Sequence, residues 1–206
     1  MMRYLSVKLL LVSSIFLLAA CSPATPTMEQ ATPSLEPTSV KPYHPLTTRT
    51  GVEEVDRVLE AVASGDQQEL LSVVQFTEAK CTHAQGLGGP PKCREGEEEG
   101  TSIEVFPFLG GEGSYLRKDE IGNWHELDAS ALYAVYEVSP DVHGEEYFPA
   151  GDYVILLINS RNGEPVALRV SEGEIVRVDF LYVPIPETLD ALIQREASNV
   201  VLAPRN

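Results

Sequence analysis

The stretch that decides the fold is DYVILLINSRNGEPVALRVSEGEIVRVDFLYV, residues 152–183. It holds three apolar runs rich in β-branched and aromatic residues, at 153–159, 165–170 and 175–183. Arg-Asn-Gly-Glu and Glu-Gly-Glu separate the runs, and both are typical turn sequences. The stretch therefore predicts three consecutive antiparallel strands, with a type I′ turn at Asn162-Gly163.

These turns also predict a register. A two-residue loop at Asn162-Gly163 and a three-residue loop at 172–174 bring only apolar side chains together on one face, which favours this register over a slip by one residue. The predicted pairs are Leu157–Leu168, Ile155–Val170, Val170–Val176, Leu168–Val178 and Val166–Phe180. The opposite face, here called the mixed face, combines apolar residues with Arg169, Arg177 and Asp179. Such a face is exposed at a sheet edge, lies in a subunit contact, or lines a pocket.

The rest of the domain predicts mixed α and β structure. Thr50 and Glu53 have the spacing of a capping box, and Asp66 can cap a second helix. We expect helices from 50 and 66, strands at 101–108 and 131–138, a loop at 109–114, a helix at 116–127, a short helix at 183–197 and a tail at 198–206. The expected fold is α+β, with two N-terminal helices, a curved and mostly antiparallel sheet ending in the meander, and a short C-terminal helix.

The N-terminus carries an export signal. Residues 1–8 include Arg3 and Lys8 and no acidic residue, and a 12-residue apolar run follows. Such a run spans about 18 Å as a helix, too short for a ~30 Å hydrocarbon core. Leu18-Ala19-Ala20-Cys21 then resembles the lipobox of bacterial lipoproteins. This resemblance implies cleavage before Cys21 and attachment of fatty acids such as palmitate to that residue; the alternative is an ordinary secretory peptide with a chance cysteine.

Composition divides the exported chain. Residues 21–49 contain six prolines and many threonines and serines, so they predict an extended tether. Residues 50–206 are enough for one extracytoplasmic domain. Without Arg3 and Lys8, 13 basic residues stand against 31 acidic ones, a net charge of −18. Such a surface excludes nucleic acid as a partner and tolerates cationic partners.

The segment CTHAQGLGGPPKC, Cys81 to Cys93, has several possible roles. In an oxidising compartment the two cysteines favour a disulfide, which would stabilise the fold by about 3 kcal/mol for a loop of this length. With His83 they make only three zinc ligands, at spacings unlike those of zinc fingers. The glycines lack the lysine of a phosphate loop. A metal site and a free or regulatory thiol pair stay open as alternatives.

The order of elements, with VLEAVASGDQQELLSVV (58–74) at its start, resembles the nuclear transport factor 2-like cone shared by ketosteroid-isomerase-like proteins. This resemblance implies a curved sheet, helices and a pocket between them, and it implies no single activity. In isomerase-like enzymes, carboxylates and tyrosines perform acid–base chemistry. Asp179 with Tyr133 or Tyr136 could take those roles, but Arg169 and Arg177 should keep Asp179 ionised, so we favour a surface ion-pair cluster.

No metal spacing, cofactor motif or nucleophile motif occurs, so we expect no cofactor and no metal. The favoured interpretation is a non-enzymatic lipoprotein that a lipid on Cys21 holds to the cell membrane, facing outside the cytoplasm, where it binds a small molecule or a protein. The alternative is a small cone-fold enzyme of the isomerase, cyclase or hydratase type. A third possibility is a subunit whose mixed face packs on a partner. Trp124 and His125 could wall a pocket or anchor a helix.

Overall fold

The computed structural model describes residues 43–205 except 87, 111, 122–126, 145–146 and 183–186. These residues belong to one compact unit, Val40–Asn206. The lipobox with Cys21 and the predicted wall residues Trp124 and His125 lie outside the described residues. Within the described parts of the chain, no helix has both the length and the apolar content needed to cross a membrane.

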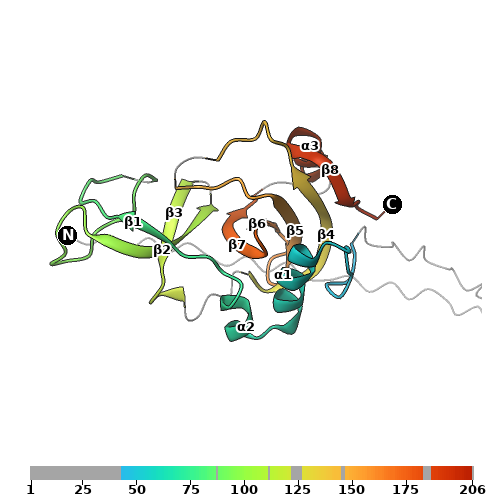
Figure 1. Ribbon diagram of the computed structural model, residues 1–206, viewed down its shortest axis with the longest axis horizontal. Coiled ribbons are helices and arrows are strands. Elements are labelled where there is room, and N and C mark those ends of the chain that lie inside the picture. Colours follow the sequence, from blue (N-terminus) through green and yellow to red (C-terminus); the bar gives the residue numbers. More distant parts are fainter. Residues whose placement is uncertain are drawn as a thin grey trace, which may run out of the picture. The chain divides into compact units, whose positions relative to one another are not determined.

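One sheet forms the centre of the fold (Figure 1). Its strands are β1 (Thr77–Lys80), β2 (Ser102–Gly110), β3 (Glu112–Arg117), β4 (Ala129–Val138), β5 (Tyr153–Asn159), β6 (Pro165–Ser171), β7 (Glu174–Phe180) and β8 (Ala197–Leu202). They run in the order β1-β2-β7-β6-β5-β4-β8, and β3 pairs with β2 outside this order. The β2–β7 pairing is parallel and the other pairings of these strands are antiparallel. Mixed α and β content with a mostly antiparallel sheet is thus confirmed, and strands dominate it.

The three strands of the meander form as predicted, but the type I′ turn at Asn162-Gly163 and part of the register are wrong. Asn159 and Glu164 close the first hairpin around a four-residue loop, so Ile155 faces Leu168, two residues away from the predicted pairing. The Asn159 side chain accepts a hydrogen bond from the Arg161 amide at 2.8 Å, which favours this wider loop. The same face stays buried because a two-residue slip preserves the alternation of a strand.

The second hairpin is closer to the prediction. The pairs Leu168–Val178 and Val166–Phe180 are confirmed. Val170 faces Ile175 in place of Val176, because a register shift follows Arg169 and the turn has two residues. Both turn residues, Glu172 and Gly173, have positive φ values of 52° and 76°, as a type I′ turn requires.

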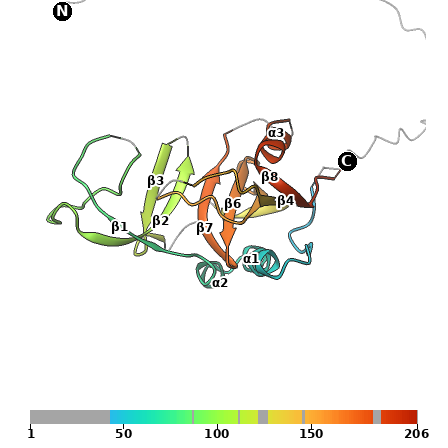
Figure 2. The same ribbon diagram turned by 45° about the horizontal axis from the view of Figure 1, so that its top comes forward.

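Helices cover both faces of the sheet (Figure 2). They are α1 (Glu53–Ser64), α2 (Gln67–Leu71) and α3 (Glu187–Glu196). Val55, Leu59 and Val62 of α1 pack into the core that includes Ile155 and Leu168. Leu189 and Ile193 of α3 pack into a second core on the mixed face, with Tyr133, Tyr136 and Leu156. Each fully buried aliphatic side chain stabilises the fold by about 1.5–3 kcal/mol.

One of the two predicted helix caps is confirmed. Asp66 caps α2, accepting hydrogen bonds from the Gln68 and Glu69 amides. The capping box predicted for Thr50 is wrong, since α1 begins after Val52 and has no side-chain cap. The carboxylate of Asp56 instead accepts hydrogen bonds from the amide and hydroxyl of Thr50.

Three strands replace structure that the sequence predicted differently. β3 occupies part of the predicted loop 109–114 and the start of the predicted helix 116–127, whose residues 118–120 form a turn. β8 lies in the predicted tail, and β1 was not predicted. β1 and β3 pair with β2, and β8 pairs with β4. These pairings supply the backbone hydrogen bonds that a local sequence pattern could not reveal.

Residues that composition assigned to the tether contribute to the folded unit. His44 exchanges backbone hydrogen bonds with Leu132 of β4 at 2.7 and 2.9 Å. Its Nε2 lies 2.8 Å from the carbonyl oxygen of Ala203, which follows β8. The ring of Tyr43 packs edge-on against Tyr133, with 6.2 Å between the centroids. The chain therefore enters the domain beside β4 and the C-terminal segment.

Candidate functional site

The charged residues of the mixed face come together, but they are buried. Arg169, Arg177 and Asp179 are only 5%, 8% and 5% exposed, so the expected surface cluster is in fact an internal one. Glu196, at the end of α3, joins them and is 7% exposed. Two guanidinium groups and two carboxylates thus meet between the sheet and α3, and their formal charges balance. We call these four residues the buried cluster.

Direct hydrogen bonds occupy both oxygens of Asp179. Its Oδ1 accepts from Arg177 Nε at 2.6 Å, and its Oδ2 accepts from Arg177 Nη2 and Arg169 Nε, each at 2.8 Å. Arg169 Nη2 donates to Glu196 Oε2 at 2.9 Å. Paired charges with satisfied hydrogen bonds are the form in which ionised side chains tolerate burial.

The remaining arginine donors hold the long connection between β4 and β5. Arg177 Nη1 donates to the carbonyl oxygens of Phe148 and Pro149 at 3.0 and 3.1 Å, and Arg169 Nη1 donates to that of Ala150 at 3.1 Å. Phe148 also packs on Tyr115 of β3, with ring centroids 5.3 Å apart. The buried cluster therefore ties α3 and the 148–150 segment to the sheet.

The two candidate tyrosines have different partners. Tyr136 OH donates to Glu196 Oε2 at 3.1 Å and so joins the buried cluster, whereas Tyr133 OH donates to Asp190 Oδ1 of α3 at 2.8 Å. Burial raises the pKa of both phenols well above 10, helped by the nearby carboxylates. Both phenols are therefore protonated at neutral pH and cannot act there as bases.

Glu196 was missed by the sequence analysis. Burial alone would raise its pKa, but hydrogen bonds and charges from Arg195 and Arg169 outweigh burial and lower it. Its position gave a usable signal, because Leu189, Ile193 and Glu196 lie on the same side of a helix by the i, i+4, i+7 spacing. A carboxylate at the end of an apolar stripe predicts a buried partner of opposite charge.

The predicted disulfide between Cys81 and Cys93 is present, with Cα atoms 4.9 Å apart. It closes an exposed segment between β1 and β2, which we call the disulfide lobe (residues 81–86 and 88–101). Backbone hydrogen bonds brace the lobe: Thr82 N donates to Pro91 O at 2.9 Å, and Cys93 N donates to Thr82 O at 3.0 Å. The Cys81 amide donates to the Thr101 carbonyl oxygen, and the Cys81 carbonyl oxygen accepts from the Gly100 amide, each at 2.9 Å.

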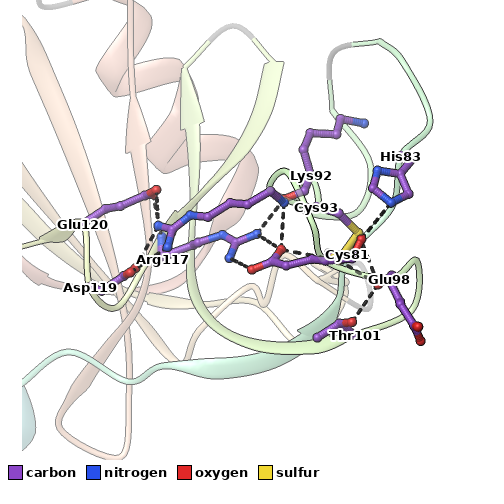
Figure 3. A network of polar contacts seen from close by, with 11 residues as sticks. Cys81, His83, Lys92, Cys93, Glu98, Thr101, Arg117, Asp119 and Glu120 are labelled. Carbon is purple, nitrogen blue, oxygen red and sulfur yellow. Dashed lines mark hydrogen bonds and ion pairs between the residues drawn. A yellow bond between two sulfur atoms is a disulfide. The ribbon is translucent and has the colours of Figure 1, made fainter.

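An ion-pair network joins this lobe to β3 (Figure 3). Glu97 accepts two hydrogen bonds from Arg117, at 2.6 and 2.7 Å, and a third from the Arg94 amide at 2.7 Å. These bonds, those of Arg117 above all, lower the pKa of Glu97 to about 2. Arg94 in turn pairs with Asp119 at 2.7 Å and with Glu120 at 2.5 Å.

Potential metal ligands in the lobe lie close together but lack the necessary chemical form. The ligand atoms of Cys81, Cys93 and Glu97 lie within 4.8 Å of one another. A metal binds the thiolate, whereas these two sulfur atoms are bonded to each other. His83 is exposed, and its Nε2 contacts the Glu97 carbonyl oxygen at 3.0 Å. In the disulfide form, Cys81 and Cys93 therefore offer no thiolate to a metal.

Comparison with protein-family models, curated proteins and solved structures finds no match for this chain.

Proposed function

We propose that this chain is a lipid-anchored extracytoplasmic protein whose domain binds a protein partner through the disulfide lobe and catalyses no reaction. The observation that carries the proposal is the lobe itself, an exposed segment that a covalent bond and the Glu97–Arg117 pair both fix. Exposed loops on a rigid scaffold are where proteins concentrate their binding residues. Fixing a loop before association reduces the entropy lost on binding.

The charge of the lobe favours a basic partner. Arg94 and Arg117 are already paired with carboxylates, whereas Glu95, Glu98 and Glu99 are exposed in one short turn. The whole chain carries a net charge of −16, which adds long-range attraction for a cationic surface. Complementary charge raises association rates and selects among partners.

The position of the lobe also supports this proposal. The chain enters the domain at Tyr43 and His44, beside β4 and Ala203. In both ribbon views, the lobe next to β1 lies at the opposite end of the domain from β8 and the C-terminus. Within the domain, the lobe is therefore remote from the segment at Tyr43 and His44.

The proposed anchor rests on the lipobox-like sequence ending at Cys21. Lipid chains contribute about 0.8 kcal/mol per buried CH₂, so several chains on one residue hold a protein firmly to a membrane. The disulfide fits an oxidising compartment outside the cytoplasm. The packing of α1 on one face of the meander supports, as part of the same proposal, kinship with the nuclear transport factor 2-like cone.

The contacts of Asp179 weigh against the alternative of an acid–base enzyme. A general base must reach the proton of a substrate. Asp179 is buried and its two oxygens already accept three arginine hydrogen bonds. Tyr133 and Tyr136 point their hydroxyls at carboxylates of α3.

Photo-crosslinking in intact cells tests the binding surface. A photoreactive residue at Gln85, in the lobe, should give a discrete adduct that disappears when Glu98 and Glu99 are both changed to Lys. The same charge change at Glu53 and Glu54, on α1, is the control and should leave the adduct in place. Absence of an adduct at Gln85, or an equal adduct from a photoreactive residue at Glu60 of α1, would contradict the proposal.

Metabolic labelling tests the anchor separately. Labelled palmitate should enter the wild-type protein, and a Cys21→Ser variant should remain unlabelled and leave the membrane fraction. Equal labelling of both proteins would exclude Cys21 as the acylated residue without bearing on the lobe.

A further inference from the structure

A cavity of about 410 Å³ lies where α1 ends, α2 begins and β4 starts. This volume falls within the ~300–1,000 Å³ typical of small-molecule sites. Its apolar wall consists of Leu46, Ala61, Val62, Ala63, Leu70, Leu127 and Ala129. Ala61, Val62 and Leu127 are each less than 10% exposed, so core residues form the wall.

The polar part of the lining offers acceptors for hydrogen bonds and negative charge. Asp66 and Asp128 contribute carboxylates, and no lysine, arginine or histidine is among the described lining residues. Gln67 donates its amide nitrogen to the Ile121 carbonyl oxygen at 3.1 Å, so its own amide oxygen remains an acceptor. An ammonium group has three N–H donors and no acceptor, which matches this lining.

The capping role of Asp66 leaves capacity for a ligand. The hydrogen bonds with which Asp66 caps α2, at 2.7 and 3.1 Å, both end on Oδ1, so capping does not use Oδ2. Asp128 pairs with Arg161 at 3.4 Å, but the two side chains are 49% and 57% exposed. An exposed pair of this kind is weak, so an ammonium group can compete with Arg161 for Asp128.

We infer that this cavity binds a primary amine with an apolar body. The ammonium group would lie at Asp66, near Asp128, and the apolar body would lie along the wall formed by Val62 and Leu127. An anionic head would meet the carboxylate of Asp66, and the net charge of the chain disfavours it further. This site is distinct from the disulfide lobe and does not depend on the role proposed for it.

Methyl NMR of the purified full chain, labelled at alanine, tests this inference with n-hexylamine, hexanol and hexanoate as probes. Alanines 61, 63 and 129 line the cavity and should shift saturably with n-hexylamine. Ala134 and Ala167, which lie in the core beneath α3, should not shift. Hexanol should bind about tenfold more weakly, because an uncharged hydroxyl forfeits about 1.4 kcal/mol of charge-assisted bonding, and hexanoate should not bind.

Two variants and one control test which residues of the cavity bind the amine. Asp66→Asn keeps a good helix cap and should weaken n-hexylamine binding about tenfold. Glu98→Gln removes the same charge in the disulfide lobe and should leave the affinity unchanged. Ala63→Phe adds a ring at an exposed lining position and should abolish binding while the Ala134 and Ala167 signals stay in place.

Three results would overturn the inference. The first is binding of hexanol or hexanoate as tight as that of n-hexylamine. The second is an equal affinity of the Asp66→Asn variant and the wild type. The third is a set of alanine shifts that spreads over both cores or does not saturate.

Discussion

The described part of the chain holds a buried and an exposed arginine–carboxylate network, and these two networks differ in how much water reaches them. In the buried cluster under α3, the side chains of Arg169, Asp179 and Glu196 are 6%, 7% and 9% exposed. In the network at the disulfide lobe, the side chains of Arg94 and Asp119 are 43% and 65% exposed. The same pair of chemical groups therefore works at two very different effective dielectric constants.

The difference changes what each network can do for the fold. In the buried cluster each charge depends on its partners, because an unpaired ion in the interior loses its hydration without compensation. In the exposed network water and salt replace a lost partner. The lobe is thus held chiefly by the Cys81–Cys93 bond and by the partly shielded Glu97–Arg117 pair. In contrast, α3 is held by ion pairs, by the hydrogen bonds of Tyr133 and Tyr136, and by apolar packing.

The largest effect is expected from Asp179→Asn. This change removes the carboxylate that three arginine hydrogen bonds share and leaves excess positive charge buried, so unfolding in urea should require about 3–5 kcal/mol less free energy. Asp119→Asn makes the same chemical change in the exposed network and is the control. A loss for Asp179→Asn no larger than that of the control would refute the distinction between the networks.

The second effect concerns the disulfide. Replacing both Cys81 and Cys93 by Ala should cost about 3 kcal/mol, because the unfolded chain then regains the entropy of an open loop. Amide exchange should rise first at Thr82 and Cys93, whose backbone bonds brace the lobe. Unchanged exchange there, with faster exchange at α3, would show that the lobe does not depend on the bond.

The third effect is a pH dependence of the lobe. The pKa of Glu97 falls from 4.5 to about 2 in the folded protein, so its contribution is complete above 4.5 and is lost as the pH falls towards 2. Amide exchange in the lobe, referenced to the free-peptide rate at each pH, should show protection falling over this interval. The Glu97→Gln variant should lack this dependence, and Glu99→Gln should keep it. A wild-type lobe whose protection is constant over the interval would contradict the role of the Glu97–Arg117 pair.

The smallest effect is expected from Arg94→Gln. The guanidinium group of Arg94 is exposed and its partners Asp119 and Glu120 remain hydrated without it, so the melting temperature should stay within error of the wild type. High salt should likewise leave the melting temperature unchanged. A drop comparable to that of the cysteine variant would mean that the exposed network carries real stability.

Much of the fold could be predicted from local sequence, and the predictions that were wrong failed for specific physical reasons. Alternation and turn residues predicted β5, β6 and β7, and the apolar stripe predicted α1. β3 was missed because its sequence, EGSYLR, has little strand pattern and is held by pairing with β2. The first hairpin was misregistered by two residues because the Asn159 side chain accepts a hydrogen bond from the Arg161 amide, which favours a four-residue loop over the two-residue turn predicted at Asn162-Gly163.

Three residues of the candidate site could be predicted from the sequence, but whether water reaches them could not. The mixed face placed Arg169, Arg177 and Asp179 together correctly, since residues of like parity on adjacent strands share a face. Whether that face met water, a ligand or a helix depended on where α3 packed. Glu196, the fourth member, is 17 residues beyond Asp179 in the chain, so no spacing within the meander could identify it.

The sequence by itself determined the meander, the parity of its two faces, the α1 stripe and the pairing of Cys81 with Cys93, because each depends on neighbours in the chain or on a count of two cysteines within the domain. Tertiary structure alone decided that the charged face is buried, that α3 supplies its fourth ion, and that a cavity opens between α1, α2 and β4. These properties arise where elements far apart in sequence exclude water together. The cost of removing a charge from water depends on everything around that charge and on nothing in its immediate sequence.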